Sequence, residues 1–119
     1  MRLLLDECLP IRLRELLLGH DARTVAYMGW KGVRNGRLLA NAAAAGFDGL
    51  ITSDGSIESQ QNLAALPLAI VALEAASNDL SDIEPLIPAL LIKLVNLPPC
   101  AVTPVSRFDL PTSSQDASS

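Results

Sequence analysis

The 119-residue sequence has few aromatic, cysteine and histidine residues, and each shortage argues against a class of function. Aromatic side chains make up 3% of the chain, which disfavours a module that stacks nucleobases on aromatic platforms. The two cysteines, Cys8 and Cys100, form neither a disulfide framework nor a metal motif, and we expect two reduced core residues. With His20 as the one histidine and no nucleophile elbow, a hydrolytic triad has no support.

The sequence also lacks a long apolar run. The longest stretch, from Ala64 to Leu73, contains Pro67 and has about half of the ~20 residues that a membrane-spanning helix needs. Near the start, Asp6 and Glu7 end the apolar run that follows Met1, so we expect no export signal. A cytoplasmic protein without a membrane partner is the resulting prediction.

Charge is scarce and unevenly distributed. Charged residues make up 18% of the chain against 50% hydrophobic residues, with a mean hydropathy of +0.33, which excludes wholesale disorder. Residues 1–37 hold seven basic and four acidic side chains, whereas residues 38–119 hold two and nine, giving +3 and −7 within the net charge of −4. The basic third can attract a phosphate backbone locally, although charge alone favours a solvated face.

Five short apolar segments predict strands. The length favours one domain, residues 1–109, and the polar segment 110–119 predicts a disordered tail. Leu68–Leu73 is apolar on both faces, which is typical of the middle of a parallel sheet, and Pro104 predicts an edge position for the last strand. The predicted strands are Arg2–Leu5, His20–Val25, Phe47–Thr52, Leu68–Leu73 and Ala101–Val105.

Helices are predicted between these strands. Ser81 and Glu84 form a capping-box pattern that predicts a helix to about Val95, bent by Pro88. The other predicted helices are Ile11–Leu18, Gly36–Ala45 with Asn35 as its cap, and a short one through Ser59–Asn62. Alternating strands and helices predict a three-layer α/β fold whose central sheet is mainly parallel and flanked by helices.

Acidic residues follow two of the predicted strands. Asp6 and Glu7 end the first strand, and Asp54 ends the third. If these strands are adjacent and parallel, the carboxylates meet at one edge of the sheet, where their repulsion favours a bound Mg²⁺ or Mn²⁺. Such a cation lowers the pKa of a bound water and can hold a phosphate. Alternatively, Asp54 caps the helix that follows it.

Several motifs follow one another along the chain: Leu3–Pro10, Gly19–Val25, Met28–Trp30, Asn35–Gly36, Phe47–Asp54, Gln61–Leu63 and Leu68–Leu73. Their order and spacing make the chain resemble the PIN-like proteins of toxin–antitoxin type over nearly its whole length except the tail. The resemblance implies a PIN-like fold and a metal-dependent ribonuclease that uses Mg²⁺ or Mn²⁺ to hydrolyse RNA. It also implies a cognate antitoxin that silences the enzyme, and a homodimer, since members of this type often dimerise.

The resemblance also assigns roles to individual residues. Asp6 resembles the first metal-binding acid, Asp54 the acid that closes the third strand, and Glu7 an auxiliary ligand or water-orienting group. Thr52 or Ser53 would hydrogen-bond a ligand carboxylate or a phosphate oxygen. The basic residues available to a substrate phosphate are Lys31, Arg34 and Arg37.

Two positions depart from the family pattern. Arg37 stands where relatives commonly have Glu, and Ser56 stands where they often have a second acid after Asp54. Glu58 could substitute if its helix turns it inward. Arg37 is open to a second interpretation, as a solvated helix residue or part of an ion pair.

Two other functions fit parts of the pattern. A catalytically weakened PIN-like module would bind RNA and partners without turnover. A receiver-like phospho-acceptor domain also places an acid pair after the first strand and an Asp after the third. That class needs a lysine at the end of the fifth strand, where this sequence has none, since Lys93 falls on a predicted helix.

Overall fold

The computed structural model describes residues 1–33, 35–54 and 66–106 of the chain. The strands of these residues form one five-stranded parallel sheet in the order β2–β1–β3–β4–β5. The predicted α/β fold with a mainly parallel sheet is confirmed. The first strand has its predicted bounds, the second is shorter by one residue at each end, and the other three begin one or two residues later than predicted. The strands are β1 Arg2–Leu5, β2 Asp21–Thr24, β3 Gly49–Thr52, β4 Ala69–Leu73 and β5 Val102–Val105.

The interior of the sheet is built from the most apolar segments. Every residue of β3 and β4 is buried, as expected for strands covered by helices on both faces. In β1, Leu3, Leu4 and Leu5 are buried, and Leu5 lies opposite Ile51 of β3. This register fixes which residues emerge next to each other where the two strands end.

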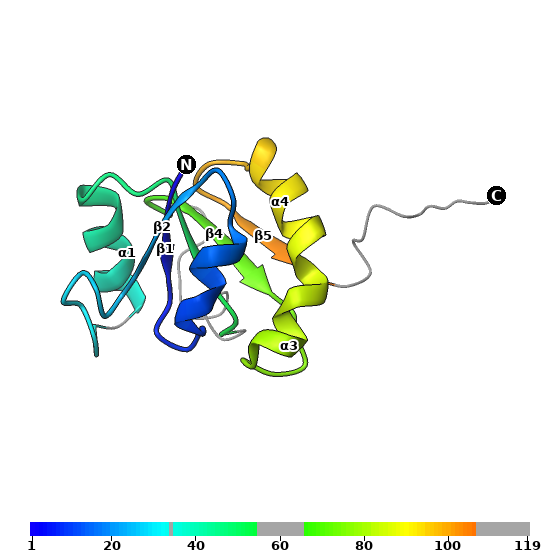
Figure 1. Ribbon diagram of the computed structural model, residues 1–119. Helices are drawn as coiled ribbons and strands as arrows, with labels where there is room; N and C mark the ends of the chain where they lie inside the picture. The colour runs from blue at the N-terminus through cyan, green and yellow to red at the C-terminus, as the bar shows by residue number, and fades with distance from the viewer. Residues whose placement is uncertain (34, 55–65, 107–119) are drawn as a thin grey trace.

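Helices cover both faces of the sheet, which confirms the three-layer prediction (Figure 1). Because side chains alternate along a strand, Leu3 and Leu5 pack in one core layer and Leu4 in the other. Buried residues of the 3-10 helix η1, of α3, of the 3-10 turn η3 and of α4 fill the first layer, and buried residues of α1 fill the second. The bounds are η1 Ile11–Leu16, α1 Asn35–Ala44, α3 Leu80–Ile83, η3 Glu84–Leu86 and α4 Ile87–Val95.

The predicted capping box is wrong. Asp79, not Ser81, occupies the N-cap position of α3, and Asp79 makes no side-chain cap hydrogen bond. The Ser77 hydroxyl instead donates to Asp82 Oδ2 at 2.5 Å and accepts from the Asp79 backbone N–H at 3.0 Å. The helix α3 therefore begins at Leu80, two residues earlier than a helix capped by Ser81 would.

Other helix predictions also need correction. The segment after α3 is not one bent helix, because Pro88 lies in the first turn of α4. A backbone N–H in the first turn has no partner within the helix, so proline is tolerated there. The predicted helix Ile11–Leu18 is a 3-10 helix that ends at Leu16. α1 begins at Asn35, one residue before the predicted start. Among the helices of the described part of the chain, none has the length and apolar character needed to cross a membrane.

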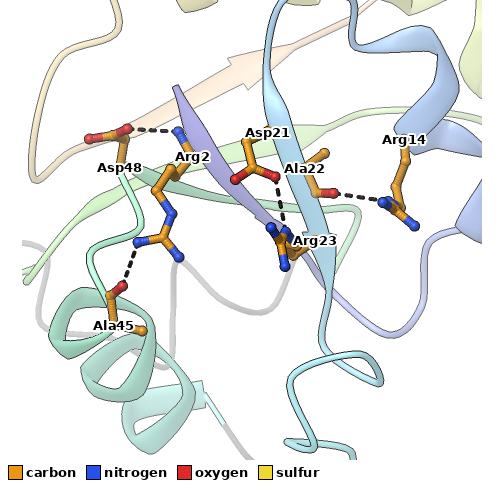
Figure 2. Close-up of polar contacts among 7 residues, drawn as sticks. All are labelled: Arg2, Arg14, Asp21, Ala22, Arg23, Ala45 and Asp48. Carbon is orange, nitrogen blue, oxygen red and sulfur yellow. Dashed lines mark hydrogen bonds and ion pairs between the residues drawn. The ribbon is translucent and has the colours of Figure 1, made fainter.

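Both edges of the sheet carry a basic side chain on an outward-facing carbonyl. On β2, Arg14 Nε donates to the Ala22 carbonyl at 2.9 Å (Figure 2). On β5, Lys93 Nζ donates to the Pro104 carbonyl at 2.9 Å. The predicted edge position of Pro104 is confirmed, since β5 pairs with β4 alone among the described strands.

The two cysteines lie outside the buried core. Both cysteines are free, but Cys100 is exposed and Cys8 is half-buried, so the expectation of two core residues is wrong. Cys100 lies at φ +55°, in the turn before β5, where the chain leaves the core. The predicted helix Ser59–Asn62 and the predicted tail 110–119 lie outside the described residues.

Candidate functional site

The sequence-predicted acids lie at the point where the sheet changes direction. The chain passes from β1 outward to β2 and then back across β1 to β3, so β1 and β3 are neighbours whose connections run to opposite sides. In doubly wound sheets of this strand order, ligands bind beyond the carboxyl ends of the strands at such a switch point. Asp6 follows β1 and Asp54 follows β3 by two residues, so the predicted adjacency of the two strands is confirmed.

Asp6 is held by hydrogen bonds to its backbone and to its carboxylate. Its backbone N–H donates to the Ile51 carbonyl at 3.0 Å, which continues the ladder between β1 and β3. The Thr52 hydroxyl donates to Asp6 Oδ2 at 2.7 Å, and the Glu7 backbone N–H donates to Asp6 Oδ1 at 2.8 Å. Because Thr52 is fully buried, the carboxylate is fixed from the core side.

Thr52 connects the two acids. Its hydroxyl oxygen also accepts from the backbone N–H of Asp54 at 3.0 Å. One buried hydroxyl therefore sets both the carboxylate of Asp6 and the backbone at Asp54. Of the two roles predicted for Thr52, the geometry matches the hydrogen bond to a carboxylate.

Asp6 and Asp54 line the same hollow, which we name the acidic cleft. Its volume is about 520 Å³, within the range of roughly 300–1,000 Å³ that is usual for ligand sites. Asp54 is exposed and Asp6 is half-buried, so both reach solvent. The acidic cleft is lined by Asp6, Glu7, Cys8, Gly32, Val33, Leu38, Asp54 and Asn78.

Glu7 lies between two hollows. It lines the acidic cleft and also a second one of about 300 Å³, which we name the side cleft. The backbone N–H of Gly32 donates to Glu7 Oε2 at 3.4 Å, a long bond that leaves the carboxylate able to accept others. The side cleft is lined by Asp6, Glu7, Leu9, Ile11, Thr24, Ala26 and Lys31.

Asn78 is a cleft residue that the sequence did not indicate. It lies in the loop after β4, and its Oδ1 accepts a hydrogen bond from the Ser53 hydroxyl. Ser53 also lies 3.3 Å from the Cys8 sulfur. With Oδ1 engaged, the Asn78 amino group is the donor that this side chain can offer to a ligand. Its position after the strand next to β3 is the one signal that could have drawn attention to it.

The predicted basic residues are not gathered in the acidic cleft. Arg37 is exposed on α1 and is not among the lining residues, although its neighbour Leu38 is. Lys31 lines the side cleft. Arg34, Ser56 and Glu58 lie outside the described residues. Whether Glu58 substitutes for the acid that is missing at Ser56 therefore stays a prediction.

The acids in the cleft suit a cation with few protein ligands. Within residues 1–33, 35–54 and 66–106, no group of three or more histidine, cysteine, aspartate or glutamate side chains is arranged to hold a metal ion. Mg²⁺, however, is usually bound through one or two carboxylates and keeps several waters. Each Asp6 oxygen accepts one hydrogen bond, and a carboxylate oxygen has a second lone pair to give. The donor set of Asp6 and Asp54 therefore fits that cation.

Comparisons with known proteins add no relative to this description. Searches of protein-family models, curated proteins and solved structures gave no match for the chain. The resemblance to PIN-like proteins thus rests on the sequence motifs, and the chemistry of the site rests on the geometry of the acidic cleft.

Proposed function

We propose that the chain is a metal-dependent ribonuclease of PIN-like type, the toxin of a toxin–antitoxin pair. The observation that carries the proposal is the convergence of Asp6 and Asp54, from two neighbouring parallel strands, on one cleft at the switch point of the sheet. The motif resemblance supplies the substrate class, RNA, and the partner, a cognate antitoxin. The acidic residues supply the reason why a cation is needed there.

The polar residues at the acidic cleft, together with Thr52 behind them, have defined roles in this proposal. Asp6 and Asp54 would hold Mg²⁺ or Mn²⁺, and Thr52 keeps the Asp6 carboxylate in place. The cation would supply activation of a water and would offset charge on the phosphodiester. Glu7 would accept a hydrogen bond from a water in the cleft, and Asn78 would donate its amino group to a phosphate oxygen.

Cleavage of RNA by the purified chain in Mn²⁺ tests the proposal. We expect Asp6→Asn and Asp54→Asn to lower kcat at least about 100-fold, since even residues that only orient metal ligands contribute 10–100-fold. Glu15→Gln is the matched control, because Glu15 is an exposed carboxylate on η1 outside both the acidic cleft and the side cleft. Equal activity of all variants would show that the hydrolysis came from a contaminant.

A catalytically weakened binding module is the second candidate. It is favoured by the lack of a three-residue metal group within the described ranges. In this case RNA binds without being cleaved, and calorimetry with Mn²⁺ gives no heat of binding. The same assay therefore distinguishes the two functions.

A receiver-like domain is less well supported. It would share the strand order and the acid after β3, but β5 carries no lysine. Lys93 donates to the Pro104 carbonyl and does not line the acidic cleft. Incubation with acetyl phosphate and Mg²⁺, followed by mass spectrometry, would detect phosphorylation of Asp54 if this function were the right one.

The proposed partner surface is the outer face of α4. Ile92 and Val95 are 54% and 76% exposed on a helix whose one charged residue is Lys93, and apolar helix faces are normally covered. We propose that an antitoxin or a second copy of the chain packs there. Light scattering that gives a monomer at high concentration would contradict self-association and leave the antitoxin.

A further inference from the structure

We propose that the side cleft binds a nucleobase of single-stranded RNA, next to the phosphate that lies in the acidic cleft. This inference rests on the proposed function and adds a substrate subsite to it. The two clefts share Asp6 and Glu7 as lining residues. A nucleotide chain that places a phosphate in the acidic cleft therefore has its adjacent base within reach of the side cleft.

Part of the lining of the side cleft is apolar. Leu9 is buried, whereas Ile11 is 65% exposed although it is a large aliphatic residue. An occupant that covers Ile11 gains from removing this surface from water. The flat face of a nucleobase can pack on aliphatic side chains, as bases do in pockets with apolar walls.

The polar residues that line the side cleft match the hydrogen-bonding edge of a base and the phosphate backbone attached to it. Thr24 Oγ1 accepts from the Tyr27 backbone N–H at 3.0 Å, so its own hydrogen can be donated to a base carbonyl or ring nitrogen. Glu7 can accept from an exocyclic amino group, a pairing that carboxylates make with cytosine. Lys31 adds a positive charge for the next phosphate.

These groups favour a base over an apolar side chain of a protein partner. An aliphatic side chain would cover Ile11 but would leave the second oxygen of Glu7 and the hydroxyl hydrogen of Thr24 without partners in the filled cleft, which costs free energy. A base can bond to both while it packs on the same apolar side chains. A protein occupant remains a defined outcome of the test below.

Two substrates separate the side cleft from the acidic cleft. Bis(p-nitrophenyl) phosphate has a phosphodiester but no nucleobase, whereas a short single-stranded RNA of mixed sequence has both. In Mn²⁺, we expect Ile11→Ser and Lys31→Gln each to lower the ratio of kcat/KM for RNA to kcat/KM for the small diester by about tenfold. Leu18→Ser is the control, because Leu18 is 76% exposed and lies outside both clefts.

The outcomes distinguish this subsite from the proposed function. An unchanged ratio in both variants overturns the subsite while leaving the nuclease in place. If the wild type hydrolyses neither substrate, the nuclease is overturned, and fluorescence anisotropy with fluorescein-labelled RNA decides the subsite. A weaker Kd in Ile11→Ser, but not in Leu18→Ser, then supports it. Equal Kd values, or no RNA binding by the wild type, overturn it and leave the cleft to a protein partner.

Discussion

Replacing Thr52 with valine removes the hydroxyl that joins the two acids of the acidic cleft and leaves the shape of the side chain nearly unchanged. The hydroxyl donates to Asp6 Oδ2 and accepts from the Asp54 backbone N–H. Thr52 is fully buried, so water cannot reach the added methyl group. We expect the variant to fold, with Asp6 no longer fixed from the core side.

The expected loss of stability follows from the two hydrogen bonds. A bond to a charged group contributes about 1.5–3 kcal/mol, and one between neutral groups about 0.5–1.5 kcal/mol. Asp6 and Asp54 reach solvent, so water replaces part of what Thr52 supplied. We therefore expect the free energy of unfolding to fall by about 2 kcal/mol, a factor of roughly 30 in the ratio of folded to unfolded protein.

Urea denaturation measures this loss through the midpoint at constant slope. Thr103→Val is the matched control, because Thr103 is half-buried on the edge strand β5 and lies outside the acidic cleft. A change of less than about 0.5 kcal/mol for Thr52→Val, the scale of an ordinary surface substitution, refutes the reasoning. Under the proposed function, the same variant also weakens Mn²⁺ binding about 10–100-fold, which calorimetry can follow.

Three further predictions concern the framework around the site. Gly46→Ala puts a Cβ 2.8 Å from Arg2 Nη1 at φ +86°, whereas Gly19→Ala has nothing near it at φ +85°. We expect the free energy of unfolding, measured by denaturation, to fall by about 1 kcal/mol more for Gly46→Ala than for Gly19→Ala. The reason is that the hydrogen bond from Arg2 to the Ala45 carbonyl is displaced (Figure 2). Equal losses in the two variants would contradict this. Leu90→Ala, in the fully buried core, should cost roughly 2–5 kcal/mol in the same assay, and a cost under about 1 kcal/mol would argue against its packing. Burial, with a smaller effect of the N-terminal amine, lowers the pKa of His20 below its ordinary value of 6.5. An NMR titration should therefore give a midpoint under 6.5, with the His20 contribution to stability present above pH 6.5 and lost as the pH falls through the folded-state value; a midpoint at 6.5 or higher disproves it.

The sequence was most informative where a buried strand meets a charged residue. The apolar run that forms β4 could be predicted because a strand covered on both faces has apolar residues at every position, which makes a continuous apolar segment. Asp6 and Asp54 were predicted to meet because parallel strands deliver their carboxyl ends to one edge. Arg37 was grouped with the site because it stands where relatives of the resembled family commonly have Glu, but Leu38, not Arg37, lines the cleft.

Loop residues were beyond the reach of the pattern. Asn78 enters the acidic cleft from a loop whose path depends on hydrogen bonds such as Ser77 to Asp82, and such bonds leave no periodic signal. For the same reason the Ser81–Glu84 pattern misled, since the side chain that bonds near the start of α3 is Ser77, which accepts from the Asp79 N–H and donates to Asp82. Local hydrogen bonds of serine and aspartate compete with one another, and sequence spacing alone does not decide which forms.

The basic side chains on the two edge strands have a consequence for assembly. Ala22 and Pro104 each present a carbonyl to the outside, and Arg14 and Lys93 already occupy these acceptors. Proline also has no N–H to offer an incoming strand. A second chain would have to displace the Arg14 or the Lys93 side chain from an edge strand before it could add a strand there. The sheet therefore resists lengthening into a fibril or a shared intersubunit sheet. Self-association, where it occurs, is then left to helical surfaces.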